Sequence, residues 1–149
     1  MKRDLSAGKA QEKHKKMNIA LMSHDAKKEL MVQFCIAYCG IFAGHDLCAT
    51  NTTGRYISEA TGLPITLYMG GSAGGCQQIS ARIAYNEIDL VIFLRDPKEK
   101  NTKDIDDVAR MCDERSIPFA SNIATAEVLV QGLRRGDLDW RDIVNPKKK

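Results

Sequence analysis

The chain has 149 residues and a formal net charge of +3, with 44% hydrophobic and 28% charged residues. This length suits one domain with a core of its own, and no apolar run approaches the roughly 20 residues that a membrane-spanning helix needs. The composition therefore excludes an integral membrane protein and is typical of a soluble globular domain.

Basic residues gather at both ends of the chain. Six Lys or Arg lie within residues 1–16, and the sequence ends in Lys147-Lys148-Lys149. We interpret residues 1–16 as a disordered basic tail and residues 145–149 as a second basic tail, on either side of one domain at residues 17–144. No aromatic residues are interleaved with these basic runs, so we do not expect a nucleic-acid partner.

Short apolar runs alternate with amphipathic stretches between the tails. The runs typical of strands are 18–23, 46–50, 64–69, 88–94 and 117–121. The stretches with helical spacing are 26–39, 55–61, 77–85, 104–115 and 125–134. This alternation predicts an α/β fold, a single three-layer domain with a mainly parallel five-stranded sheet and helices on both faces.

Two finer predictions concern the core. The run 88–94 is the most continuous apolar stretch of the chain, so we expect it to be the central strand. Beyond Gly136, Trp140 and Ile143 are the expected anchors of the C-terminal segment.

The five cysteines are odd in number and lack the spacing of a zinc site or a disulfide framework. They are Cys35, Cys39, Cys48, Cys76 and Cys112. We expect reduced thiols, and since the N-terminus also lacks an apolar signal segment, a cytoplasmic protein.

Residues 70–78 hold four glycines in nine positions, after an apolar run and before a helical pattern. Glycine permits positive φ and lets a ligand approach bare backbone, and a helix start with free N–H groups attracts anions. The stretch predicts a strand, a loop that binds an anion and a helix. A tight turn without a ligand is the alternative.

A phosphate pocket is predicted where the polar ends of the strands meet. In parallel sheets, ligands bind outside the carboxyl ends of the strands. Thr50, Thr52 and Thr53 offer hydroxyl and backbone N–H groups there, and Lys28 adds a charge. The alternative is that the threonines cap a helix and that Lys28 is a solvated surface residue.

Four titratable residues are candidates for acid-base chemistry: His24, Asp25, Asp96 and Asp104. A neutral histidine donates to a substrate carbonyl, and a carboxylate removes a neighbouring proton. Acids near strand ends also serve as caps or ion-pair partners, so spacing alone leaves catalysis open.

Several motifs together resemble the methylglyoxal synthase family in order and spacing, over roughly residues 18–130. They are Ser23-His24-Asp25-Ala26-Lys27-Lys28, Ala49-Thr50-Asn51-Thr52-Thr53-Gly54, Gly74-Gly75-Cys76-Gln77-Gln78, Ile88–Phe93 with Arg95-Asp96-Pro97, and Ile117-Pro118 with Asn122–Ala126.

The resemblance implies a lyase that converts dihydroxyacetone phosphate to methylglyoxal and inorganic phosphate through an enediolate. It implies no metal and no organic cofactor, and a homo-oligomer that in this family is usually a hexamer. His24 would polarise the substrate oxygens or shuttle protons, and Asp25, Asp96 and Asp104 would complete the polar site. The resemblance also implies a set of groups that hold the phosphate: Lys28, Thr50, Thr52, Thr53, Gly70 and Gly71.

The sequence departs from the family pattern at four places. Cys76 stands where the family has its catalytic aspartate, and Gly70-Gly71-Ser72 replaces a Ser-Gly-Pro. The segment that brings a second histidine is shortened to Asn101-Thr102-Lys103-Asp104, and the family's C-terminal arginine has no clear equivalent. Asp104 stays in register with the helix that follows.

Three readings of function remain open from the sequence. The first is an active methylglyoxal synthase with Asp104 or Cys76 as base, where a helix N-terminus would lower the pKa of the thiol. The second is a module that binds a phosphorylated metabolite or nucleotide and has lost catalysis. The third makes Cys76 a nucleophile or a redox-sensitive thiol.

Overall fold

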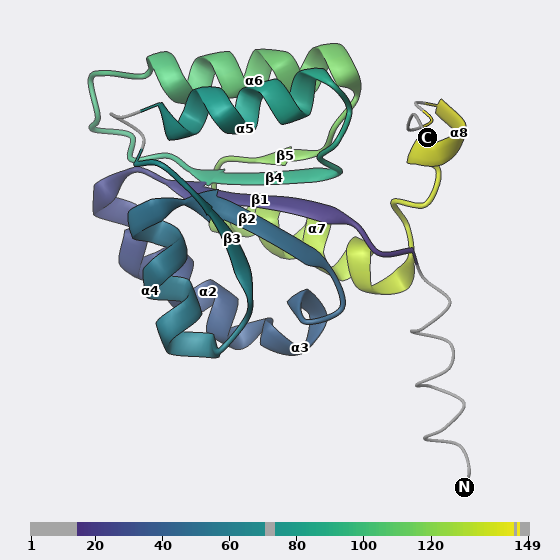
Figure 1. Cartoon of the computed structure of the whole chain (residues 1–149), viewed down its shortest axis with the longest axis horizontal. Coiled ribbons are helices and arrows are strands. Elements are labelled where there is room, and N and C mark those ends of the chain that lie inside the picture. The colour runs from purple at the N-terminus through teal and green to yellow at the C-terminus, as the bar shows by residue number, and fades with distance from the viewer. Residues whose placement is uncertain (1–14, 71–73, 145, 147–149) are drawn as a thin grey trace, which may run out of the picture.

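A five-stranded parallel sheet lies at the centre of the molecule (Figure 1). In this computed structural model, residues 15–70, 74–144 and 146 are described. The strands are β1 (Asn18–Ser23), β2 (Asp46–Thr50), β3 (Ile65–Tyr68), β4 (Leu90–Leu94) and β5 (Phe119–Ala120), in the order β3-β2-β1-β4-β5. Residues 1–14 of the predicted N-terminal tail and Lys147–Lys149 lie outside the described part.

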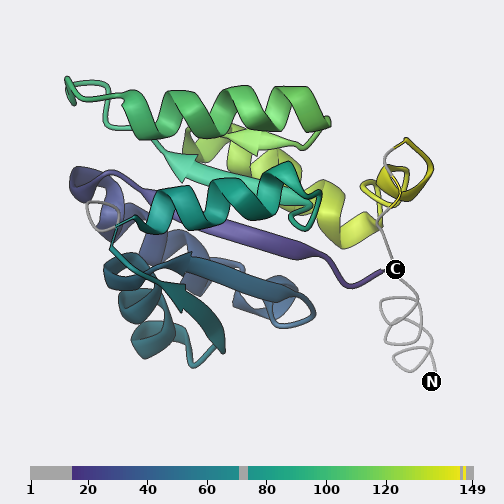
Figure 2. The ribbon, with the colours of Figure 1, turned by 45° about the horizontal axis from the view of Figure 1, so that its top comes forward.

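Helices cover both faces of the sheet, which confirms the predicted three-layer α/β class. They are the 3₁₀ turn η1 (Asp25–Lys27), α2 (Lys28–Ala37), α3 (Cys39–Phe42), α4 (Asn51–Thr61), α5 (Gly75–Ala84), α6 (Lys103–Arg115), α7 (Ile123–Arg135) and α8 (Arg141–Val144). Helices α5 and α6 lie on one face, and α2, α3, α4 and α7 lie on the other. Figure 2 shows the strands rotated relative to one another, the twist expected of a sheet of L-residues.

Alternate residues of each strand enter two separate cores. Ile19 and Leu21 of β1 pack with α2, α4 and α7, whereas Ala20 and Met22 pack with α5 and α6. All four are at most 1% exposed. Since a strand buried on both faces needs apolar residues at every position, the short continuous runs of the sequence are explained.

The central strand is β1, so the prediction for the run 88–94 was wrong. Strand β1 pairs with β2 on one side and with β4 on the other, with Ile19 opposite both Leu47 and Leu90. Strand β4 is fully buried because it lies between β1 and β5 and is covered on both faces. A continuous apolar run therefore indicates that a strand is buried on both faces, but not that it is the central strand of the sheet.

The C-terminal segment is anchored by residues other than those predicted. Ile143 is 83% exposed and Trp140 is 40% exposed, whereas Leu138 and Arg141 are 6% and 2% exposed. The guanidinium of Arg141 forms an ion pair with Asp89 and donates from Nη2 to Asn86 Oδ1 at 2.7 Å. A buried ion pair thus fastens the segment.

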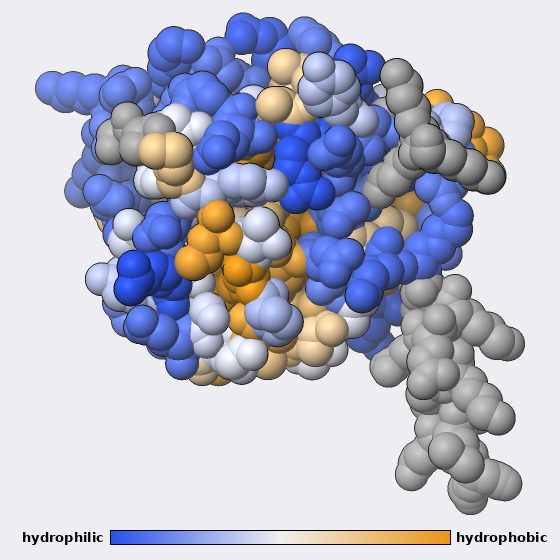
Figure 3. All heavy atoms as spheres, in the orientation of Figure 1, coloured by the Kyte–Doolittle hydropathy of each residue, from blue (hydrophilic) through white to orange (hydrophobic). Residues whose placement is uncertain are grey.

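Strand β3 forms one edge of the sheet and exposes apolar side chains. Leu67 and Met69 are 40% and 54% exposed. Figure 3 shows apolar side chains gathered on this face of the molecule. Among the described residues, no helix has both the length and the apolar character that crossing a bilayer requires.

Candidate active site

A polar cavity of about 500 Å³ lies at the carboxyl ends of β1, β2 and β4. Loops that are far apart in sequence meet at this edge because the strands run parallel. Its lining residues are Met22, Ser23, His24, Asp25, Lys28, Thr50, Thr52, Thr53, Gly70, Cys76, Phe93, Glu99, Asn101 and Asp104. The cavity thus contains nine of the eleven predicted site residues; Asp96 does not line it, and Gly71 lies outside the described residues.

His24 directly follows β1 and is held in one orientation. Its Nδ1 accepts a hydrogen bond of 2.9 Å from the backbone N–H of Asp96. Its ring packs edge-on against Phe93, with the ring centroids 5.5 Å apart. Since Nδ1 uses its lone pair as an acceptor, the neutral imidazole carries its proton on Nε2. His24 is therefore a hydrogen-bond donor through Nε2.

The threonine-rich segment forms the first turn of α4, which begins at Asn51 and not near Arg55 as predicted. Thr50 occupies the N-cap position, but its side chain makes no capping hydrogen bond. Thr50 and Thr53 are 8% and 3% exposed, and both line the cavity. The first N–H groups of a helix have no partner within the helix and carry partial positive charge. This end of α4 suits an anion.

Among the described residues that line the cavity, Lys28 is the one lysine, and there is no arginine. Its Nζ lies 3.5 Å from Asp25 Oδ1 and 5.4 Å from the centroid of the Tyr56 ring. The Asp25 side chain is fully exposed, so solvent screens this ion pair and its strength is small. The charge of Lys28 thus remains effective toward an anion in the cavity.

Cys76 and Asp104 meet at the cavity wall from the neighbouring helices α5 and α6. Burial, and to a smaller extent the negative charge of Asp104 and a hydrogen bond to its carboxyl group, together raise the pKa of the Cys76 thiol to about 12. The prediction that the helix N-terminus would lower this pKa was therefore wrong. Desolvation outweighs the helix dipole because Cys76 is 6% exposed and also belongs to the core under α5.

The raised pKa determines the protonation state of the Cys76 thiol near neutral pH. At pH 7, a thiol with a pKa of about 12 is ionised in about one chain in 100,000. Cys76 is therefore a neutral thiol that donates to Asp104, and it lacks the thiolate that a base or a nucleophile needs. Asp104 is the carboxyl group that this thiol contacts at the cavity wall.

Asp96 does not line the cavity and acts through its backbone. Its N–H positions His24, and its Oδ1 accepts a hydrogen bond of 3.0 Å from the N–H of Lys98. The loop after it brings Glu99 and Asn101 to the cavity, and Glu99 Oε2 accepts from the N–H of Asn101 at 3.2 Å. Sequence reasoning missed Glu99 and did not assign Asn101 to the site; their only signal was the polar run between two predicted elements.

The glycine-rich stretch is described on both sides of a gap. Gly74 has a φ of +103°, which favours glycine, and it is the N-cap residue that precedes α5. A Cβ on Gly75 would lie 1.7 Å from the carbonyl oxygen of Met69, so only glycine fits there. Gly70 lines the cavity, whereas Gly71 and Ser72 lie outside the described residues.

Comparisons with known proteins agree with this architecture. The family model described as the MGS-like domain matches residues 31–121. A methylglyoxal synthase of Caldicellulosiruptor saccharolyticus is 59% identical over 133 residues, which cover 88% of this chain and 94% of that protein. This chain belongs to the methylglyoxal synthase family.

Two further methylglyoxal synthases support the assignment. That of Geobacillus thermodenitrificans is 51% identical over 135 residues, covering 89% of this chain and 94% of that protein. The crystal structure of the methylglyoxal synthase from Elizabethkingia anophelis has a TM-score of 0.73 and 37% identity, over 77% of each chain. Similarity therefore extends to the fold as well as to the sequence.

Arg141 does not supply the C-terminal arginine that the methylglyoxal synthase pattern leads one to seek. It does not line the cavity. Its Nη1 pairs with Asp89, which precedes β4, and its Nε lies 3.5 Å from the carbonyl oxygen of Ser116. Asp89 and Ser116 lie before the amino ends of β4 and β5, whereas the cavity lies at the carboxyl ends of the strands.

Proposed function

We propose that this chain is a lyase of the methylglyoxal synthase type, which converts dihydroxyacetone phosphate to methylglyoxal and inorganic phosphate. The observation that carries the proposal is the cavity in which His24, Lys28, the threonines of α4 and Asp104 gather. Family membership and the names of the relatives support the choice of substrate. The cytoplasmic location expected from the sequence is part of the same proposal.

Asp104 is the proposed base. Its carboxylate removes a proton from the hydroxymethyl carbon of the substrate, which gives an enediolate, and the C–O bond to phosphate then breaks as the electron pair leaves with the phosphate. The resulting enol tautomerises to methylglyoxal. Cys76 remains protonated throughout, since burial and the charge of Asp104 raise the pKa of its thiol to about 12.

In this proposal, hydrogen-bond donors stabilise the negative charge that develops at the enediolate oxygen and at the phosphate. The Nε2–H of His24 donates to the enediolate oxygen and needs no reorganisation, because Asp96 and Phe93 already fix the ring. Lys28, the N–H groups at the start of α4 and the hydroxyls of Thr50 and Thr52 hold the phosphate. The leaving group is thus bound where positive charge is concentrated.

A turnover assay tests the proposal. Purified chain is incubated with dihydroxyacetone phosphate at several pH values, and methylglyoxal and inorganic phosphate are measured separately. We expect both products in equal amounts and well above a buffer blank. The proposal fails if neither exceeds the blank, or if phosphate appears without methylglyoxal, which would indicate simple hydrolysis.

A module that binds a phosphorylated metabolite without turning it over is the second candidate. Cys76 favours it, because a neutral thiol stands where the family has its catalytic aspartate. The variant Cys76→Asp separates the two candidates. Turnover confined to the variant identifies the native chain as a binder, whereas comparable turnover in both identifies it as an enzyme.

A homo-oligomer, with a hexamer as the expected form, completes the proposal. The exposed apolar side chains Leu67 and Met69 at and beside the edge strand β3 support association, since an unpaired apolar edge is unfavourable in water. Light scattering measures the mass of the particle in solution. A monomer at micromolar concentration would overturn this part.

A further inference from the structure

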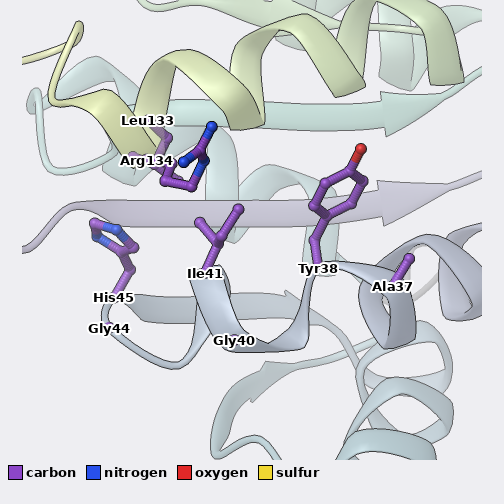
Figure 4. Close-up of a pocket in the computed structure, with 8 residues that line it drawn as sticks. All are labelled: Ala37, Tyr38, Gly40, Ile41, Gly44, His45, Leu133 and Arg134. Carbon is purple, nitrogen blue, oxygen red and sulfur yellow. The ribbon is translucent and has the colours of Figure 1, made fainter. Parts of the chain in front are cut away.

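A second cavity, of about 430 Å³, lies at the opposite end of the sheet from the candidate active site (Figure 4). It lies between α7 and the segment that joins α2 to β2, so it stands at the amino end of β2. Its lining residues are Ala37, Tyr38, Gly40, Ile41, Gly44, His45, Leu133 and Arg134. None of these residues was assigned a role by the sequence or belongs to the first cavity.

The guanidinium of Arg134 is held at the cavity wall by Gln131. Gln131 Oε1 accepts hydrogen bonds from Arg134 Nε at 3.1 Å and from Arg134 Nη2 at 2.9 Å. These two bonds occupy the side of the guanidinium that carries Nε and Nη2. The end edge, formed by Nη1 and the second N–H of Nη2, makes no hydrogen bond with any other described residue. Figure 4 shows Arg134 extending from α7 toward Ile41 of α3.

The charge of Arg134 is not neutralised by a carboxylate among the described residues. Asp137, the acid nearest to Arg134 in sequence, accepts a hydrogen bond from Arg135 at 2.8 Å, and Asp46, next to His45, pairs with Lys16 at 3.7 Å. No acidic side chain lines the cavity within the described chain. The cavity therefore presents an oriented cation without a counter-charge.

The rest of the wall combines an apolar surface with the rings of Tyr38 and His45. Ile41 and Leu133 give the apolar part, and the ring of Tyr38 is fixed against Phe34 at a centroid separation of 4.9 Å. His45 Nδ1 accepts a hydrogen bond from the N–H of Met17 at 2.9 Å, which positions the ring at the cavity wall. Small pockets that combine apolar walls with a few fixed polar groups are typical ligand sites.

We propose that this cavity binds a small organic anion, a carboxylate or a phosphate monoester attached to an apolar group. The anionic head contacts the end edge of Arg134 through two parallel N–H bonds, the geometry that a guanidinium offers to both kinds of anion. The apolar group lies against Ile41 and Leu133. The site is separate from the cavity that holds Asp104, and its binding does not require turnover.

Nuclear magnetic resonance of the ¹⁵N-labelled, deuterated full chain tests this proposal. The amide signals of Gly40 and Gly44 report on the second cavity, and those of Thr52 and Gly70 report on the first. The probes are benzoate, phenyl phosphate, inorganic phosphate and the neutral benzyl alcohol. We expect benzoate and phenyl phosphate at millimolar concentrations to shift Gly40 and Gly44, with inorganic phosphate confined to Thr52 and Gly70.

Two pairs of variants make the test specific. Arg134→Gln should weaken binding of benzoate by about tenfold or more, whereas Arg135→Gln, which alters an arginine paired with Asp137 outside the cavity, should not. A Cβ on Gly40 meets nothing within 4 Å, so the side chain of Gly40→Leu can fill the cavity without a clash with the fold. This variant should abolish the benzoate-induced shifts. Its control is Ala43→Leu, on the same segment but outside the cavity lining.

Three results would overturn the proposal. The first is that no organic anion shifts Gly40 or Gly44. The second is that benzyl alcohol shifts them as strongly as benzoate, which would remove the role of the charge. The third is that Arg134→Gln and Arg135→Gln behave alike. A chain without turnover would still give the expected shifts, so this readout is independent of the proposed lyase activity.

Discussion

His24 Nδ1 accepts its hydrogen bond from the backbone N–H of Asp96, a residue 72 positions away, at 2.9 Å. The bond joins the ends of two adjacent strands and leaves Nε2–H as the donor. In His24→Asn, the Oδ1 atom can still accept the N–H of Asp96, but the donor near the substrate is lost. In His24→Gln, the amide N–H stands near the place of Nε2.

We therefore expect His24→Asn to keep its thermal stability close to that of the native chain and to lose about 100-fold or more in kcat. His24→Gln should lose less. Steady-state kinetics with dihydroxyacetone phosphate and thermal denaturation measure the two effects. An Asn variant that is more active than the Gln variant would contradict the assigned tautomer.

Lys28 should act on substrate binding. Lys28→Met removes the cationic side chain of the cavity, and we expect KM for dihydroxyacetone phosphate to rise about tenfold. The affinity for inorganic phosphate should also become less sensitive to salt. Lys27→Met is the matched control, because Lys27 does not line the cavity. Equal KM values for the two variants would show that Lys28 does not hold the phosphate.

Arg141 should contribute to the stability of the fold without touching the candidate active site. Both members of its ion pair with Asp89 are 2% exposed, so Arg141→Met removes the guanidinium that faces a buried carboxylate and should cost about 3–5 kcal/mol. Arg135→Met, which breaks an exposed pair with Asp137, should cost less than about 1 kcal/mol. Urea denaturation measures both. Similar costs would show that the buried pair adds nothing beyond a surface pair.

The buried thiols should make the fold sensitive to alkaline pH. Burial raises the pKa values of Cys35, Cys76 and Cys112 from 9.0 to about 12. Between these values the folded chain binds more protons than the unfolded chain, so the free energy of unfolding falls as pH rises above about 9. Each thiol contributes a slope of about 1.4 kcal/mol per pH unit at most.

The variant Cys112→Ala isolates one such thiol. It should be less stable than the native chain at pH 7, because a buried sulfur is lost, but its stability should fall less steeply between pH 9 and pH 11. Urea denaturation at each pH gives the two slopes. Identical slopes would mean that Cys112 titrates as it does in the unfolded chain.

Much of the fold is predictable because burial on both faces of a parallel sheet leaves continuous apolar runs. The bounds of β1 and β2 agree with the predicted runs 18–23 and 46–50. The place of each strand in the sheet is set by the crossover connections, which carry no local signal, and β4 was therefore put at the centre. Arg141 was missed because a charged residue near a chain end is normally exposed, and only its distant partner Asp89 makes burial favourable.

The residues of the candidate site that lie at the end of a strand were predictable from the sequence. His24 and Thr50 stand at strand ends, and the sequence places them there. Glu99 comes to the cavity through a loop whose path is set by its own side-chain hydrogen bonds. The pKa of Cys76 was predicted in the wrong direction, because the sequence shows the helix start but not the packing around the thiol or the approach of Asp104.

The most direct measurement compares kcat/KM for the native chain, Asp104→Asn and Cys76→Ala on dihydroxyacetone phosphate. Asn keeps the size of the carboxyl group but cannot accept the proton, so we expect a loss of about 1,000-fold or more. Cys76→Ala should stay within about tenfold of the native chain, since its thiol remains protonated with a pKa of about 12. Near-native activity in Asp104→Asn, or an equally large loss in Cys76→Ala, would contradict the assignment of Asp104 as the base.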